Sequence, residues 1–208
     1  MPNPLQGAQF ALAAHRINQL PADLGAEVAF AGRSNAGKSS ALNALTGHKG
    51  LARTSKTPGR TQQMVAFTLP LQVDGSAARL IDLPGYGYAK VPEDLREHWK
   101  HEIDAYLHRR QSLRGVVLIA DIRHPLKAFD QMMLDFCVAT ALPCHLLLTK
   151  ADKLSRNQAA QSLATIRRGL GEGVTVQAFS STAGTGLDDA REAVVALLGR
   201  RRIDQASA

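Results

Sequence analysis

The chain has very little cysteine, and this scarcity excludes two ways of stabilising a small protein. Only Cys137 and Cys144 occur among its 208 residues, so a framework of several disulfides is excluded. The pair does not have the spacing of zinc ligands, which excludes a cysteine metal centre. Each cysteine stands in an apolar run of the sequence. We therefore expect two buried, reduced thiols, as is usual for a protein of the cytosol.

Long hydrophobic runs are also missing. No uninterrupted apolar stretch approaches the roughly 20 residues of a membrane-spanning helix, so we expect no membrane partner. Residues 1–25 lack the basic start, apolar core and small-residue cleavage site of a signal peptide, which argues against secretion. With 45% apolar and 21% charged residues, the composition is typical of a globular protein. We expect a cytoplasmic monomer.

Acidic side chains are the third deficit. Lys and Arg outnumber Asp and Glu by 25 to 18, which gives a net charge of +7. The basic side chains gather in residues 48–61, which contain no acid, and again in residues 109–114 and 200–202. Clustered positive charge favours a polyanionic partner, and RNA first among these in the cytosol. The alternative is that the charge only keeps the domain soluble.

Apolar runs alternate with helix-compatible segments along the chain. The expected strands span residues 27–31, 64–73, 78–82, 115–121, 144–149 and 174–179. The expected helices span residues 38–46, 93–107, 126–141, 155–170 and 187–198. This alternation predicts a three-layer α/β fold, in which helices cover both faces of a mostly parallel six-stranded sheet.

A short polar turn at residues 74–77 predicts that the strands on either side of it pair as a hairpin. One antiparallel edge strand is therefore expected. The length suits one domain, which we place at residues 26–199. Residues 1–25 are expected to be an extension that packs on or near this domain, and residues 200–208 a flexible basic tail.

The most informative motif directly follows the strand expected at residues 27–31. It matches the phosphate-loop pattern G-x-x-x-x-G-K-[ST] and consists of Gly32, Arg33, Ser34, Asn35, Ala36, Gly37, Lys38 and Ser39. The glycines let several backbone N–H groups converge on an anion at a helix N-terminus. Lys38 would contact the β- and γ-phosphates, and Ser39 would offer its hydroxyl to Mg²⁺. A glycine-rich turn with a solvated lysine is the plain alternative, but the strand before it and the helix after it favour a nucleoside triphosphate site.

A second motif ends the strand expected at residues 78–82. It reads Asp82, Leu83, Pro84 and Gly85. In a nucleotide switch, such an Asp reaches Mg²⁺ through a water molecule, and such a Gly donates its N–H to the γ-phosphate. Loss of that phosphate would release the loop.

Residues 54–62 form a third group, rich in hydroxyls, on the loop between the first helix and the next strand. Switch NTPases use a hydroxyl from this loop to complete the Mg²⁺ shell. We expect Thr61 to be that ligand, and Thr57 is the competitor. The alternative is a purely structural turn formed by Pro58 and Gly59, with hydroxyls that contact only solvent.

Two motifs in the C-terminal part of the chain indicate which nucleotide base is bound. One follows the strand expected at residues 144–149 and reads Thr149, Lys150, Ala151 and Asp152. The Asp152 carboxylate can accept from both N1–H and the 2-amino group of guanine, a pattern that adenine does not offer. The other motif reads Ser180, Ser181 and Thr182 and can offer a backbone N–H to guanine O6. Together they favour GTP.

These motifs resemble those of the EngB family of bacterial GTPases, which belongs to the Era-like branch of translation-factor-related GTPases. Three details are similar to EngB rather than to Era itself. They are the Gly-Tyr-Gly-Tyr-Ala-Lys run at residues 85–90, the Asp-Ile-Arg-His-Pro run at residues 121–125, and Thr149 where most GTPases carry Asn. The resemblance covers roughly residues 10–200.

The resemblance implies a Ras-like P-loop GTPase fold and Mg²⁺-dependent hydrolysis of GTP. It also implies a role in assembling the large ribosomal subunit and a link to septum formation in cell division. Beyond the residues named above, it assigns nucleotide contacts to Gly59, Arg60, Thr61, Gln62, Gln63 and Phe179. Ser39 and Thr61 are the implied Mg²⁺ ligands, with Asp82 acting through water. The implied catalytic residues are Lys38, Asn35, Thr61 and Gly85.

Tyr86 is a departure that affects the mechanism. Many GTPases carry Gln directly after the glycine equivalent to Gly85 and use it to orient the attacking water. With Tyr86 there, we expect slow intrinsic hydrolysis that needs outside help. Asn35 resembles an Asn that binds a monovalent cation in potassium-activated GTPases. We hypothesise that K⁺, a ribosomal particle, or both complete the site; Asn35 as an ordinary loop residue is the alternative.

The sequence therefore predicts a GTP-hydrolysing switch whose affinity for the large ribosomal subunit, or its precursor, depends on GTP or GDP. A passive guanine-nucleotide-dependent binding module with negligible turnover is the alternative that Tyr86 favours. A small-molecule kinase shares the phosphate loop but has no need of residues 149–152. Asp121 and Arg123 are expected to be a structural pair in a turn.

Overall fold

The computed structural model describes residues 2–52, 63–86, 93–124 and 126–200, with the side chains of residues 93–100 excepted. Within these ranges the chain forms one seven-stranded sheet. Its strands are β1 (Gln9–Ala14), β2 (Ala26–Gly32), β3 (Met64–Val73), β4 (Ser76–Asp82), β5 (Leu113–Asp121), β6 (Cys144–Thr149) and β7 (Val174–Ala178). The helices are α1 (Lys38–Thr46), α2 (Glu93–Arg109), α3 (Ala128–Ala139), α4 (Arg156–Arg168) and α5 (Leu187–Leu198), with short 3-10 turns η1 (Ile17–Gln19) and η2 (Ala151–Lys153).

The strand order in the sheet is β1-β3-β4-β2-β5-β6-β7. Strands β4, β2, β5, β6 and β7 are mutually parallel, whereas β3 runs antiparallel to both β1 and β4. The β3–β4 hairpin closes on a two-residue turn, since Val73 pairs with Ser76. Asp74 and Gly75 both have positive φ, at 53° and 73°, as a hairpin turn of this length requires.

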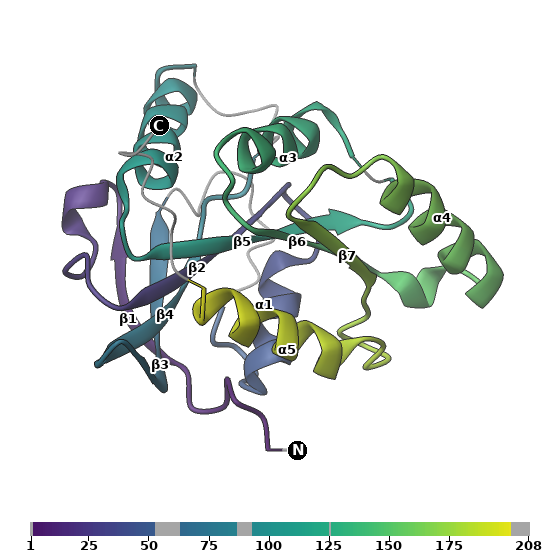
Figure 1. Ribbon diagram of the computed structural model, residues 1–208, viewed down its shortest axis with the longest axis horizontal. Coiled ribbons are helices and arrows are strands. Elements are labelled where there is room, and N and C mark those ends of the chain that lie inside the picture. The colour runs from purple at the N-terminus through teal and green to yellow at the C-terminus, as the bar shows by residue number, and fades with distance from the viewer. Residues whose placement is uncertain (1, 53–62, 87–92, 125, 201–208) are drawn as a thin grey trace.

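Helices cover both faces of the sheet, and Figure 1 shows α2, α3 and α4 on one side with α1 and α5 on the other. Alternate residues of a strand serve the two resulting cores. On β5, Val116 and Leu118 pack with residues of α2, α3 and α4, while Val117 and Ile119 pack with residues of α1 and α5. The three-layer, Ras-like α/β fold expected from the sequence is confirmed.

Strand β1 was not expected, and the prediction of six strands was wrong by this one. Its sequence, Gln-Phe-Ala-Leu-Ala-Ala, is rich in alanine and has little intrinsic preference for a strand. Pairing with the long neighbour β3 supplies the ladder, with Leu12 opposite Ala66 and a bulge between Phe10 and Leu12. Because β1 lies outside β3, the antiparallel strand β3 is one place in from the edge.

Other differences concern element ends. Helix α3 begins at Ala128 rather than at residue 126, because Leu126 has a φ of 52°, which a right-handed helix does not accommodate. Cys137 and Cys144 are both buried and free of disulfides, as expected. Among the described residues, no helix has both the length and the apolar character needed to cross a membrane.

Candidate nucleotide site

The loops that follow β2, β4, β6 and β7 carry the sequence motifs, and these strands are parallel. Parallel strands have their carboxyl ends at one edge of the sheet, so these loops meet there. The structure thus brings together residues 32–39, 82–85, 149–152 and 179–181. The contacts between these four segments define the candidate site.

The phosphate loop approaches β5 more closely than a side chain would allow. A Cβ added to Gly32 would lie 2.6 Å from the carbonyl oxygen of Ile119 and 2.9 Å from its Cβ. Gly37 has a φ of 100° and is the N-cap of α1, a conformation that only glycine adopts readily. Both glycines are therefore required by the path of the backbone between β2 and α1.

Lys38 and Asp82 form an ion pair at the centre of the site. The Lys38 Nζ contacts Oδ1 of Asp82, which joins the first residue of α1 to the last residue of β4. Both side chains are buried, and Ser39, the next residue of α1, is half-buried. A buried cation and a buried carboxylate therefore meet beside the phosphate loop, and a residue that carries a hydroxyl comes next on α1.

The segment after β4 lies directly against the phosphate loop. The Ser34 N–H donates to the carbonyl oxygen of Tyr86 at 2.9 Å, and Arg33 forms an isolated parallel bridge with Tyr86. A Cβ added to Gly85 would lie 3.5 Å from the Ser34 nitrogen. Leu83 and Pro84 are buried beneath this contact. The main chain of residues 82–86 therefore lies against that of the phosphate loop.

The segment Thr149–Asp152, called the base motif below, also contacts the phosphate loop through its first two residues. The Thr149 hydroxyl contacts the carbonyl oxygen of Ala36 and lies 3.1 Å from that of Ala120. Lys150, which has a φ of 60°, donates from Nζ to the carbonyl oxygen of Asn35 at 2.7 Å. The described loop conformation at residues 35–37 thus depends on residues 149 and 150.

Asp152 is fixed by the loop after β7. Its Oδ1 accepts from the hydroxyl of Ser180 at 2.6 Å, and its Oδ2 lies 3.0 Å from Nζ of Lys153. The hydrogen bond from Ser180, followed by that from Lys153, lowers the pKa of the Asp152 carboxyl. The Ala151 N–H donates to the carbonyl oxygen of Phe179 at 3.1 Å. Asp152 is therefore held as a carboxylate, an acceptor of hydrogen bonds.

Asp121, at the end of β5, is a structural residue with two partners rather than one. Arg123 donates to it from Nε at 3.0 Å and from Nη2 at 2.8 Å, which is the pair expected from the sequence. Lys150 adds a contact at 3.0 Å that the sequence did not indicate. Burial favours a higher pKa for Asp121, but the hydrogen bonds from Arg123 and Lys150 outweigh it and lower the pKa.

Four of the predicted site residues, Gly59, Arg60, Thr61 and Gln62, lie outside the described residues, as does the competitor Thr57. Gln63 is described, and its Nε2 lies 2.9 Å from Nε2 of His15 at the end of β1. Ser181 is exposed and Phe179 is buried beside the loop that holds Asp152.

Sequence reasoning missed the side-chain contact of Tyr86. Its hydroxyl donates to Oδ1 of Asp130, in the first turn of α3, at 2.7 Å. An acid at this position of a helix is an ordinary capping residue. The sequence around Asp130 therefore carries no signal of a contact with Tyr86.

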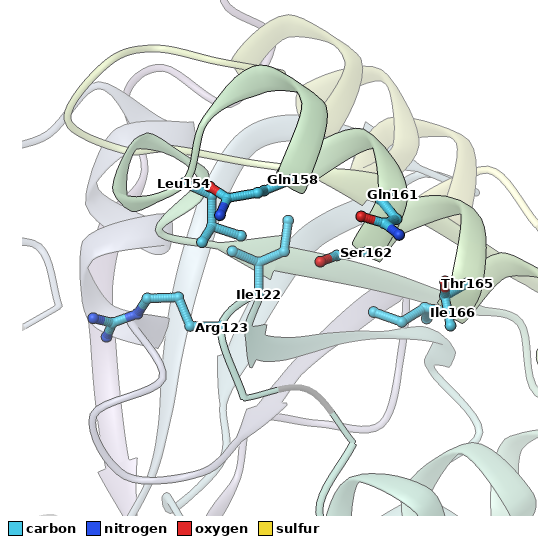
Figure 2. A pocket seen from close by; sticks show the side chains of 8 residues that line it. All are labelled: Ile122, Arg123, Leu154, Gln158, Gln161, Ser162, Thr165 and Ile166. Carbon is cyan, nitrogen blue, oxygen red and sulfur yellow. The ribbon is translucent and has the colours of Figure 1, made fainter.

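A shallow, open pocket of about 450 Å³ lies beside α4 and is separate from these contacts. Figure 2 shows that it is lined by Ile122, Arg123, Leu154 and one face of α4. No residue of the phosphate loop or of the base motif lines it. The candidate nucleotide site is therefore defined by hydrogen bonds between loops and not by this pocket.

Comparison with known proteins agrees with this geometry. Residues 27–150 match the model of a family described as 50S ribosome-binding GTPase. A probable GTP-binding protein EngB of Stenotrophomonas maltophilia is 56% identical over 199 residues, which covers 94% of this chain and 97% of the relative. Another from Xylella fastidiosa (strain 9a5c) is 52% identical over 207 residues, covering 98% of this chain and all of the relative.

Solved structures show the same fold. The crystal structure of a probable GTP-binding protein engB has a TM-score of 0.59 at 22% identity and covers 83% of this chain and 98% of its own. The cytosolic domain of the FeoB iron transporter from T. maritima, in a GDP form, has a TM-score of 0.58 at 25% identity. The match covers 86% of this chain and 66% of the FeoB chain. The family match and the high identity to curated relatives settle the assignment. The chain belongs to the EngB family of GTP-binding proteins and is a GTPase.

Proposed function

We propose that this GTPase is a switch whose affinity for the large ribosomal subunit, or for its precursor, depends on whether it holds GTP or GDP. The description of the matching family as 50S ribosome-binding supports this partner, and so does the net charge of +7, because rRNA is a polyanion. The proposal includes the link to septum formation that the family resemblance implies. It places a monomer in the cytoplasm.

The observation that carries the proposal is the direct contact between the base motif and the phosphate loop. Thr149 and Lys150 hydrogen-bond to the carbonyl groups of Ala36 and Asn35, so the two ends of a bound nucleotide would be sensed by one connected structure. The Asp152 carboxylate accepts hydrogen bonds, as recognition of guanine N1–H and the 2-amino group requires. The loop at residues 179–181 lies beside Asp152 and would offer a backbone N–H to guanine O6.

In this proposal, Lys38 contacts the phosphates of the bound nucleotide. In the structure it neutralises Asp82, a buried carboxylate at the end of β4. The β- and γ-phosphates carry more negative charge than one carboxylate, so Lys38 would contact them and release Asp82. The Gly85 N–H would donate to the γ-phosphate. Hydrolysis would remove this partner and release the Asp82–Gly85 loop.

The donors beside Lys38 fit Mg²⁺, which prefers hard oxygen ligands. Ser39 offers a hydroxyl and Asp82 a carboxylate that would act through water, with Thr61 as the proposed second protein ligand. When bound, the ion neutralises negative charge on the phosphate oxygens. Asn35 is exposed in the phosphate loop, so its amide is accessible to K⁺. Hydrolysis at equal rates in K⁺ and in Na⁺ would remove K⁺ from the proposal.

A passive binding module is the second candidate, and Tyr86 at the position where many GTPases carry Gln favours it. A phenol side chain does not orient water as the Gln amide does. Turnover measured with and without large-subunit precursor separates the two functions. A switch hydrolyses GTP faster with the precursor, whereas a module stays inert in both.

Co-sedimentation with 50S particles tests the partner and the switch together. We expect the protein to pellet with the particles in the presence of a non-hydrolysable GTP analogue and to remain largely in the supernatant with GDP. Equal binding with GTP, GDP and the analogue would contradict the switch. Absence of binding with all three would contradict the partner.

A further inference from the structure

Tyr86 contacts two parts of the structure at once, the phosphate loop and helix α3. Through its backbone it accepts from the Ser34 N–H of the phosphate loop at 2.9 Å. Through its hydroxyl it donates to Asp130 of α3 at 2.7 Å. Its ring lies 5.5 Å from that of Phe129, centroid to centroid, with an angle of 34° between the planes. The residue directly after Gly85 is therefore restrained both by its main chain and by its side chain.

Asp130 is a rigid partner for this hydroxyl. It is 1% exposed, and its second oxygen accepts from the Lys127 N–H at 2.9 Å, as part of the capping box of α3. A carboxylate in the first turn is also favoured by the helix dipole. The two oxygens thus have separate partners, one on the helix terminus and one on Tyr86.

The hydroxyl remains protonated and able to donate. Burial, followed by the nearby charge of Asp130, raises the pKa of Tyr86 well above its usual range. A hydrogen bond from a neutral hydroxyl to a carboxylate is stronger than one between neutral groups. The contact is therefore suited to holding a backbone segment in one position.

We infer that Asp130 is a positioning residue for GTP hydrolysis, because its hydrogen bond to Tyr86 holds the main chain at Gly85 and Tyr86 against the phosphate loop. Where many GTPases carry a glutamine that acts on water, this chain carries a side chain that orients the neighbouring main-chain donor. The inference rests on the proposed contact between the Gly85 N–H and the γ-phosphate. A donor fixed before the phosphate arrives does not have to be ordered on binding.

The direct test compares Tyr86→Phe and Asp130→Asn with the unaltered protein. Tyr86→Phe keeps the ring contact with Phe129 and removes only the hydroxyl. We expect the single-turnover rate of GTP hydrolysis to fall roughly tenfold, since small misplacements of a catalytic group have effects of this size or larger. The preference for a GTP analogue over GDP should fall with it, while GDP affinity stays within about twofold, because GDP lacks the γ-phosphate that Gly85 would contact.

Tyr106→Phe is the matched control. It removes another hydroxyl that donates to a buried carboxylate, that of Glu27, at 3.2 Å. Tyr106 lies near the C-terminal end of α2, outside the four segments of the site. We expect this variant to lose stability without a change in the preference for the GTP analogue. An equal loss of preference in both Tyr→Phe variants would show that general destabilisation is responsible.

The double variant Tyr86→Phe/Asp130→Asn completes the experiment. If both residues act through one hydrogen bond, the double variant loses no more activity than the more affected single variant. Additive losses, or wild-type hydrolysis and preference in Tyr86→Phe, would overturn the inference. Failure of the unaltered protein to hydrolyse GTP or to prefer the analogue would instead contradict the proposed function.

Discussion

Thr149 stands where most GTPases carry Asn, and its hydroxyl lies within reach of two buried carbonyl oxygens, those of Ala36 and Ala120. A carbonyl that loses its only donor in a dry environment is costly. At the scale of single residues, therefore, Thr149 stabilises the phosphate loop even though it lies in the base motif. A Cβ added to Gly37 would lie 3.4 Å from the Thr149 hydroxyl oxygen. There is therefore little room for a side chain larger than Thr at position 149.

Thr149→Val tests this role, because valine has the shape of threonine without the hydroxyl. We expect a loss of about 1–3 kcal/mol in the free energy of unfolding and a nucleotide affinity lower by roughly tenfold, because the phosphate loop is less ordered. Urea unfolding and a nucleotide titration measure the two effects. Thr149→Ser, which keeps the hydroxyl, is the control. Equal behaviour of the Val and Ser variants would contradict the role.

Asp121 gives a prediction on pH. Its pKa in the folded protein is lowered by Arg123 and Lys150, which outweigh burial. The stability that it contributes is therefore fully present above its unfolded pKa, about 4, and is lost as the pH falls through the lower folded pKa. We expect the advantage of the unaltered protein over Asp121→Asn in urea unfolding to be largest at neutral pH and to shrink below pH 4. An advantage independent of pH would rule out this charge effect.

At the scale of elements, a buried ionic cluster joins β2, β4 and the C-terminal end of α2. Glu27 of β2 is fully buried and accepts from Arg79 Nε at 2.8 Å and from Arg110 Nη2 at 2.7 Å. The Tyr106 hydroxyl donates to it from α2. The helix that follows the Asp82–Gly85 segment is thus fixed at its far end. Any movement of the Asp82–Gly85 segment would therefore leave the C-terminal end of α2 in place.

Glu27→Gln tests the cluster. It removes the carboxylate that two buried guanidinium groups share, although Arg110 keeps a contact with Oδ1 of Asp23 at 3.4 Å. Removal of one partner of a buried pair costs about 3–5 kcal/mol. We expect a loss of this size in the free energy of unfolding, measured with urea. Asp188→Asn, which affects the exposed pair with Arg191, should cost less than about 1 kcal/mol. Similar losses in the two variants would show that Glu27 is not a central contact.

The elements show where sequence reasoning succeeds and where it stops. Strands such as β5 and β6 are long apolar runs bounded by turn residues, so their position in a parallel sheet could be predicted. The alanine-rich β1 carries no such pattern, because its pairing is set by β3. The contact of Tyr86 with Asp130 joins residues 44 positions apart and depends on how α3 packs, which no local motif encodes. The phosphate loop and the base motif were predictable because their chemistry requires fixed residue types at fixed spacing.

At the scale of the whole molecule, the carboxyl ends of four parallel strands gather the motifs at one edge of the sheet. The ionic cluster joins Glu27, near the start of β2, to Arg79 in the middle of β4. In the proposed switch, this separation would let one end change with the nucleotide while the other end keeps the fold. The side-chain contacts between loops would connect base recognition with phosphate recognition. They rest on Thr149, Lys150 and Asp152.

The most direct test of the assigned guanine site is a titration of the unaltered protein and of Asp152→Asn with GTP, ATP and XTP. We expect the unaltered protein to bind GTP at least 100-fold more tightly than ATP or XTP, since a site with fixed acceptors rejects analogues that lack the matching donors by at least about this factor. In Asp152→Asn an amide N–H₂ replaces one carboxylate oxygen, so XTP, which has a carbonyl in place of the 2-amino group, should become the preferred ligand. Equal affinity of the unaltered protein for GTP and ATP, or unchanged GTP binding in Asp152→Asn, would contradict the assignment.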